Sequence, residues 1–397
     1  MKKPFQVNEA ERRASVSESV LDKHVPADLG HLMRREAELL FTQILSDFER
    51  TEYNLKIGGF DPCVAVGVAH HCAVGLRGKD SVLVRFFAHL ACDVVGQSVD
   101  LQECLNYARS SLKSDEKDKL LRRVYDWATF LLNAFFAPFK AQGEKYFFTP
   151  PNFEPVEGYS DHGTIRLLAN LRQRCLERDH QRCIVTRRFN LSLGNEMMRR
   201  DRQPRDMEGN LLTSNGNRFG NLQVAHIMPH SMNKMEPGEK ILRKEKRSLR
   251  DVLNMFDPGV LTQLEGSDID HPRNAISLSL EMHALFGELL LSFEPAGTWS
   301  NTEQTYNVIK YTQLLPDEIP EQITLYRDSP VSMPSRRLLE LHAACARMCH
   351  LCGAAGYVDK LRENFESRMV KADGTSKLDD MVMARLAGMQ VSARLAR

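Results

Sequence analysis

The sequence has no excess of charge of either sign. Its 53 lysines and arginines almost balance its 52 aspartates and glutamates, so the formal net charge of the 397-residue chain is +1. Bulk electrostatics therefore do not favour nucleic-acid binding by the whole protein. Any such binding must come from local clusters of basic residues.

The sequence also lacks the paired cysteines of a disulfide framework. It has nine cysteines, an odd number, scattered and mostly inside apolar stretches. This usage is typical of reduced thiols in the cytosol or nucleus.

No hydrophobic segment suits a signal peptide or a membrane span. The first eight residues, Met1 to Asn8, contain no apolar run, and no stretch approaches the roughly 20 apolar residues that a span requires. We therefore expect an intracellular protein, cytoplasmic or nuclear, without a membrane partner. Internal repeats and low-complexity tracts are absent as well.

The length favours two domains over one, and 42% apolar residues suffice for ordinary cores. Proline and glycine breaks mark the boundaries. The expected parts are a mobile arm (1–30), a helical domain (31–142), a linker (143–160), a second domain (161–320) with a basic insertion (235–266), a helical segment packing on that domain (321–360) and a charged tail (361–397).

Helical periodicity dominates the first domain. Its strongest helix is expected at 116–140, where Leu120, Val124, Trp127 and Leu131 recur at helical spacing. The adjacent His70 and His71 point in different directions on a helix, which favours packing or surface roles. We expect this domain to bind a protein partner or a second copy of the chain, or to regulate the second domain.

Further along the chain, short patterns predict individual elements. They are a helix at 167–177, a short strand at 183–186, an arginine-rich loop at 191–220, a basic helix at 240–256, a strand at 322–326 and a helix at 335–352.

The most informative stretch runs from 221 to 295. Leu222 and Val224 alternate with polar residues and predict a strand that ends at His226. A second strand is expected at 274–280. Ser279 can then cap a helix that carries His283.

Three short segments together resemble the HNH endonuclease signature, closest to a fungal-type HNH domain. They are Ala225-His226-Ile227-Met228-Pro229, the later Asp270-His271-Pro272-Arg273-Asn274, and His283 with Phe286. The resemblance covers residues 165 to 360 approximately. It implies an α+β fold that is predominantly helical, with a ββα-metal hairpin and helix at its core. It also implies hydrolysis of DNA phosphodiester bonds with a divalent ion, magnesium or manganese.

The resemblance assigns a role to each motif residue. Hydrolysis of a phosphodiester needs a base to activate water and a cation to stabilise the leaving alkoxide. His226 corresponds to the general base, Asn274 to the residue that orients it, and His283 to a metal ligand. Asp270 is a candidate second ligand, since magnesium prefers carboxylate oxygen; a turn residue before Pro272 is the alternative.

Two positions depart from well-known members of the family. A metal ligand often precedes the base histidine, where this chain has Ala225, and Gly287 stands where a further histidine is common. A second hypothesis therefore stays open, in which the hairpin and helix form a catalytically decayed scaffold that binds nucleic acid or protein. In a third, the N-terminal helical domain carries the biological role.

A structural zinc is not expected. Cys183 has no second cysteine at the spacing of a zinc pair, and it fits the role of a small buried hydrophobic residue. Cys349 and Cys352 resemble half a zinc site within a helix, and core packing is favoured for them.

Two clusters of basic residues could supply phosphate contacts to DNA. The alternative is an ordinary solvated face. The residues assigned to DNA binding are Arg187, Arg188, Arg199, Arg200, Lys244 and Arg247.

Overall fold

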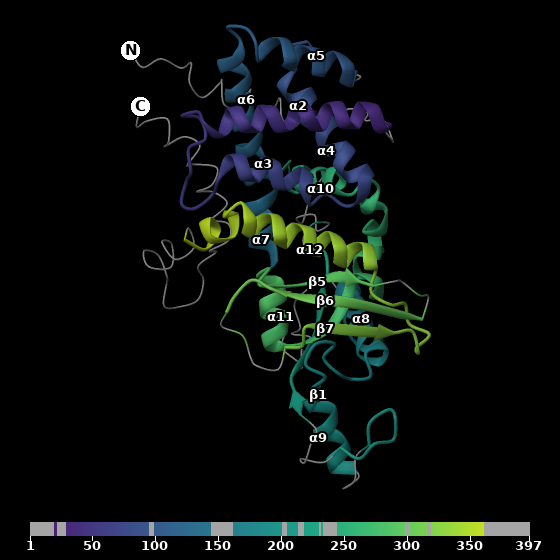
Figure 1. Cartoon of the computed structure of the whole chain (residues 1–397). Coiled ribbons are helices and arrows are strands. Elements are labelled where there is room, and N and C mark those ends of the chain that lie inside the picture. Colours follow the sequence, from purple (N-terminus) through teal and green to yellow (C-terminus); the bar gives the residue numbers. More distant parts are fainter. Residues whose placement is uncertain are drawn as a thin grey trace. The chain divides into compact units, whose positions relative to one another are not determined.

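The computed structural model describes residues 20–21, 29–94, 99–143, 162–200, 205–212, 218–229, 232, 244–297, 300, 302–313, 315 and 319–360 (Figure 1). The chain forms two compact units. Unit 1 comprises Met1–Ala141, Met235–Leu261 and Arg347–Arg397, and unit 2 comprises Gln142–Lys234 and Thr262–Ala346. The arm, linker and tail expected at 1–30, 143–160 and 361–397 lie almost entirely outside the described residues.

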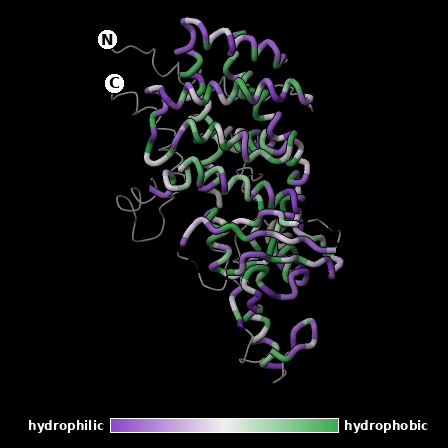
Figure 2. Tube along the Cα trace, viewed as in Figure 1, coloured by the Kyte–Doolittle hydropathy of each residue, from purple (hydrophilic) through white to green (hydrophobic). Residues whose placement is uncertain are grey.

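Unit 1 is helical, as the periodicity predicts. Asp61 caps α3, because its Oδ1 accepts a hydrogen bond from the backbone N–H of Val64 at 3.2 Å. Asp100 caps α5 in the same way. Apolar and polar residues alternate along these helices (Figure 2), which lets each helix bury one face. The elements are α2 (His31–Glu49), α3 (Pro62–His71), α4 (Gly75–Leu90), α5 (Leu101–Ser111), α6 (Lys117–Leu131), the π-helical η1 (Leu132–Phe136) and α7 (Ala137–Gly143).

The basic helix expected at 240–256 forms as α10 (Lys244–Phe256). Its end docks in unit 1. The ring of Phe256 lies 4.9 Å from that of Phe135, and its carbonyl accepts the Val74 N–H at 2.9 Å. A Cβ at Gly78 would lie 2.2 Å from this carbonyl, so only glycine permits the contact.

This docking changes the expected domain organisation. The sequence places the insertion 235–266 inside the second domain, whereas the structure groups Met235–Leu261 with unit 1. Burial of the apolar face of α10 explains the difference, because five of its apolar side chains are fully enclosed. These side chains are Leu249, Val252, Leu253, Met255 and Phe256.

Unit 2 contains the predicted hairpin and helix. β3 (Leu222–His226) pairs antiparallel with β4 (Ala275–Ser279), with Leu222 opposite Ser279 and His226 opposite Ala275. Ser279 caps α11 (Leu280–Gly287), since its Oγ accepts the Met282 N–H at 3.4 Å. α8 (His162–Arg178) packs on the hairpin through Leu171 and Cys175.

A second sheet follows the hairpin in unit 2. β5 (Leu291–Ala296), β6 (Glu303–Lys310) and β7 (Gln322–Tyr326) are antiparallel and adjacent in that order. The ring of Phe286 stacks on Phe293 at 5.5 Å and on His342 of α12 (Arg336–Leu351) at 3.9 Å. These stacked rings tie α11, the sheet and α12 into one core.

Two local predictions upstream of the hairpin are wrong. Residues 183–186 form a turn, closed by the Arg187 N–H donating to the Cys183 carbonyl at 3.0 Å, and not a strand. The expected loop at 191–220 begins with a helix, α9 (Leu191–Arg200). α9 packs on a short parallel pair, β1 (Phe189–Asn190) and β2 (Phe219–Gly220), which lies beside it in Figure 1.

The observed fold is therefore α+β and predominantly helical. None of the helices in the described part of the chain is long and apolar enough to cross a bilayer. All nine cysteines are free thiols.

Candidate functional site

The hairpin places His226 at the last residue of β3. The ladder continues one residue further, because the Ile227 N–H donates to the carbonyl of Asn274 at 2.8 Å. This bond joins the end of β3 to the turn that precedes β4. His226 and Asn274, which lie 48 positions apart in the sequence, therefore meet at the same end of the hairpin.

Asp270 holds the His226 ring. The distance between His226 Nε2 and Asp270 Oδ1 is 2.9 Å, and the two side chains are 7% and 9% exposed. A carboxylate only accepts hydrogen bonds, so Nε2 carries a proton in this contact. The contact fixes both the orientation and the tautomer of the ring. Asp270 ends η5 (Gly266–Asp270), a 3₁₀ turn beside the hairpin.

Asn274 joins two loops through its amide. Its Oδ1 accepts the Met228 N–H at 2.9 Å, and its Nδ2 donates to the carbonyls of Met228 at 3.1 Å and Ile269 at 2.9 Å. The side chain is fully buried. Asn274 therefore fixes the backbone that follows His226 and the backbone that precedes Asp270, and the contact to the His226 ring comes from Asp270.

His283 is buried on α11 against β3. Its Nδ1 lies 2.5 Å from Oε1 of Gln223, an amide oxygen that can only accept, so Nδ1 carries the proton. Burial, with a smaller effect of the His226 charge, lowers the pKa of His283 from 6.5 to about 4. The ring of His283 is therefore neutral near pH 7.

Gln223 is a site residue that the sequence did not reveal. It alternates with the apolar Leu222 and Val224, a pattern that predicts a solvent-facing side chain. In the structure it is 7% exposed because α11 covers it. A histidine that donates one N–H to an amide or carbonyl oxygen is the usual arrangement behind a metal-binding imidazole.

The sequence predicts two metal ligands, His283 and Asp270. His283 presents a neutral ring with its lone pair on Nε2, and Asp270 supplies carboxylate oxygen. Within the described residues there is no cluster of three or more His, Cys, Asp or Glu side chains able to hold a metal. Magnesium is commonly held by one or two protein ligands, with water and substrate phosphate completing its shell.

A buried ion pair between neighbouring residues supports the turn before β4. Arg178 and Asp179 contact each other at 2.7 Å. Arg178 Nη1 donates to the carbonyl of Pro272 at 2.7 Å, and Asp179 accepts the Ser277 N–H at 3.0 Å. These bonds fix both sides of Asn274. The role of this pair could not be predicted from the sequence, because its partners lie more than 90 positions away.

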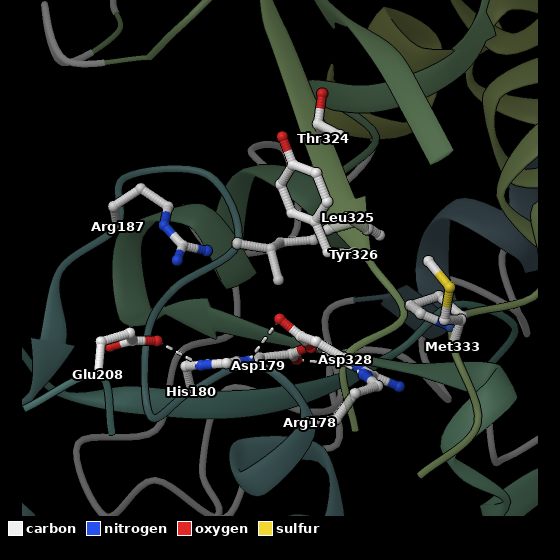
Figure 3. Close-up of a pocket in the computed structure, with 12 residues that line it drawn as sticks. Arg178, Asp179, His180, Arg187, Glu208, Thr324, Leu325, Tyr326, Asp328 and Met333 are labelled. Carbon is white, nitrogen blue, oxygen red and sulfur yellow. Dashed lines mark hydrogen bonds and ion pairs between the residues drawn. The ribbon is translucent and has the colours of Figure 1, made fainter. Parts of the chain in front are cut away.

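A separate cavity of about 220 Å³ lies at the end of α8 (Figure 3). His180 lines it and connects two distant segments. Its Nδ1 contacts Glu208 at 2.5 Å and its Nε2 contacts Asp328 at 3.0 Å. Arg187 and the Arg178–Asp179 pair also line this cavity. Partial burial disfavours the charged ring, but the bonds to Asp328 and Glu208 prevail and raise the pKa of His180.

We expect the bonds of His180 to stabilise unit 2 more at low pH than at high pH. A pKa raised above 6.5 on folding contributes stability below that value, and the contribution is lost as the pH rises through the folded pKa. Melting temperatures of wild type and His180→Gln between pH 6 and 9 should therefore converge as the pH rises. The exposed His31→Gln serves as the control. A difference that stays constant or widens would contradict this assignment.

The residues assigned to DNA binding occupy different settings. Arg187 has a left-handed backbone (φ 56°) beside the His180 cavity, and Arg188 lies 3.8 Å from Glu281. Arg199 and Arg200 are exposed at the end of α9, where Arg200 contacts Glu196 at 2.5 Å.

The other two basic residues belong to unit 1. Arg247 is exposed on α10, and Lys244 is the first residue of that helix. The structure thus divides the expected clusters between the two units, and DNA contact by any of these residues stays a prediction.

The structure has the order that the HNH resemblance predicts, a hairpin followed by a helix, with histidine at the end of the first strand, asparagine before the second and histidine in the helix. In a comparison with protein families, residues 183–294 match the family described as HNH endonuclease. This match indicates a nuclease-type domain in that part of the chain. The match includes His226, Asp270, Asn274 and His283. Searches of curated proteins and of solved structures gave no match.

Proposed function

We propose that the protein is a metal-dependent endonuclease that hydrolyses DNA phosphodiester bonds. The observation that carries the proposal is the His226–Asp270 contact at 2.9 Å, and it is joined by a second imidazole, that of His283, which burial keeps neutral. The first arrangement suits a general base and the second suits a metal ligand.

In this proposal His226 takes the proton from the attacking water. Asp270 fixes the ring and stabilises the imidazolium that forms, as an orienting carboxylate does in other hydrolases. Asn274 acts indirectly, by fixing the Met228 and Ile269 backbone that frames the pair. The nearby Arg178–Asp179 pair keeps this turn in register with β4.

His283 would hold a divalent cation through Nε2, with Asp270 as the second candidate ligand. Magnesium or manganese, when bound, would stabilise charge on the phosphate and on the leaving oxygen. Gln223 would keep the His283 ring in the tautomer whose Nε2 can bind a metal, since its Oε1 accepts the hydrogen bond from the Nδ1–H.

Nicking of supercoiled plasmid DNA tests the proposal directly. We expect the full chain to convert supercoiled plasmid to the open-circular form with Mg²⁺ or Mn²⁺, and to stop when EDTA is added. Absence of cleavage across a series of divalent ions would overturn the enzymatic proposal.

Replacing Gln223 with leucine should remove the hydrogen bond that orients the His283 ring. The proposed metal ligand, His283 itself, stays in place. We expect the Mg²⁺ concentration for half-maximal cleavage to rise about 10- to 100-fold, the usual effect of losing a residue that orients a metal ligand. The matched control is Gln322→Leu, an exposed glutamine on β7. An unchanged metal dependence of Gln223→Leu would argue against His283 as a ligand.

A catalytically decayed scaffold is the second candidate function. It is favoured by the low exposure of His226 and Asp270, 7% and 9%, and by the absence of a three-residue metal cluster within the described part of the chain. In this case the domain binds nucleic acid or a protein partner without cleaving it. DNA binding by wild type with no cleavage under any metal condition would select this alternative.

A further inference from the structure

Unit 2 contains a second and larger cavity, of about 730 Å³, whose lining is unusually basic. Four arginines contribute to it, whereas Glu340 is the one carboxylate among its described lining residues. The remaining lining is mostly neutral and polar. The arginines are Arg273, Arg327, Arg336 and Arg337.

The four arginines come from three separate segments. Arg273 lies in η6 (Pro272–Asn274), Arg327 follows β7, and Arg336 and Arg337 begin α12. One backbone hydrogen bond joins two of these segments, since the Ser335 N–H donates to the Arg273 carbonyl at 2.7 Å. The Arg327 N–H donates to the carbonyl of Thr302, just before β6, at 2.8 Å. The fold therefore brings like charges together, which is unfavourable without compensating anions.

Among the described lining residues, arginines outnumber carboxylates four to one. Asp268 lies 3.3 Å from Nη2 of Arg273, and Glu340 lines the cavity from α12. Nε of Arg273 is buried and has no hydrogen-bond partner among the described residues.

Phosphate is the anion that best matches this setting. The planar guanidinium donates two parallel hydrogen bonds to phosphate oxygens, and the N-terminus of α12 adds the positive end of its dipole. A cavity of about 730 Å³ exceeds what one phosphate fills, so it fits an extended ligand that carries phosphates.

We propose that this cavity binds backbone phosphates of a nucleic-acid strand next to the cleavage site. The assignment rests on the proposed nuclease function, because Arg273 immediately precedes Asn274 and shares its short helix η6. A strand gripped here lies close to the turn that carries Asn274 and Asp270. The cavity thus provides a phosphate subsite that positions the substrate strand beside the His226–Asp270 pair.

Equilibrium binding of a fluorescent single-stranded DNA 12-mer tests the subsite independently of cleavage. All variants of the full chain carry His226→Ala, so the measurement does not depend on hydrolysis. The test variant is Arg327→Gln with Arg336→Gln. The matched control is Arg50→Gln with Arg77→Gln, which removes the same charge from exposed positions of unit 1.

We expect the test variant to bind the 12-mer about tenfold more weakly than the control at 100 mM salt. Its plot of log affinity against log salt should be shallower by about 1.4, since each phosphate contact on a single strand contributes about 0.7. Equal melting temperatures of the two variants would show that folding is retained. An unchanged affinity and salt slope in the folded test variant would overturn the proposal.

Two further ligands separate a nucleic-acid strand from free phosphate. A 12-mer with an uncharged methylphosphonate backbone should lose the difference between test and control variants. Inorganic phosphate should compete only at millimolar concentrations. If inorganic phosphate binds in the wild type and is lost in the test variant, while 12-mer binding is equal in both, the assignment to a nucleic-acid strand is wrong.

Discussion

Replacing His226 with alanine should lower the rate of DNA cleavage by about 10²- to 10⁴-fold, the range that general acid–base catalysis contributes. The variant removes the imidazole that contacts Asp270 and that is proposed to take a proton from water. Single-turnover rates on plasmid DNA with saturating Mg²⁺ measure the effect on the chemical step and not on binding.

His31→Ala is the matched control for this variant, because it removes an exposed histidine at the start of α2. Asp270→Asn should give an intermediate loss, since the amide can still contact the ring but no longer stabilises its charged form. If His226→Ala cleaves at the wild-type rate while metal dependence persists, another residue must be the base.

Replacing Asn274 with alanine should destabilise unit 2 by about 3 kcal/mol or more. The substitution leaves three buried backbone groups without partners, namely the Met228 N–H and the carbonyls of Met228 and Ile269. Each buried unsatisfied group costs about 1–3 kcal/mol. Chemical denaturation measures the total, and faster hydrogen exchange at the Met228 amide reports the local effect.

The exposed Asn210→Ala provides the comparison, with an expected change within about 0.5 kcal/mol. Asn274→Asp should also destabilise, because a buried carboxylate would face two backbone carbonyls in place of the donating amide. Equal stability of Asn274→Ala and Asn210→Ala would show that the amide of Asn274 does not join the two loops in solution.

The sequence predicted the hairpin and its helix because three local signals agree there. Strand alternation at Leu222 and Val224, the capping Ser279 and the motif order all indicate the same structure, and β3, β4 and α11 form as expected. Local agreement of this kind depends little on tertiary contacts. The helices of unit 1 were predictable for the same reason, since each carries a clear apolar face.

Features that depend on distant contacts were not predictable. The contact of Gln223 with His283 joins residues 60 positions apart, and the pairing of His226 with Asp270 spans 44. β5 and β6 were missed because Leu291 and Phe293 directly follow the apolar residues of the preceding helix. The arginine-lined cavity was not predicted, because its four arginines come from three segments that are separate in the sequence. In the sequence alone, each segment is typical of ordinary surface charge.

The position of α10 has a consequence for how the protein can be divided. The chain passes between the two units four times, at 141/142, 234/235, 261/262 and 346/347. No single cut can release either unit intact. A fragment that begins near residue 160 would keep α10 but lose Phe135, Val74 and Gly78, its partners in the folded protein. Its uncovered leucines and Phe256 would promote aggregation, so nuclease assays require the whole polypeptide.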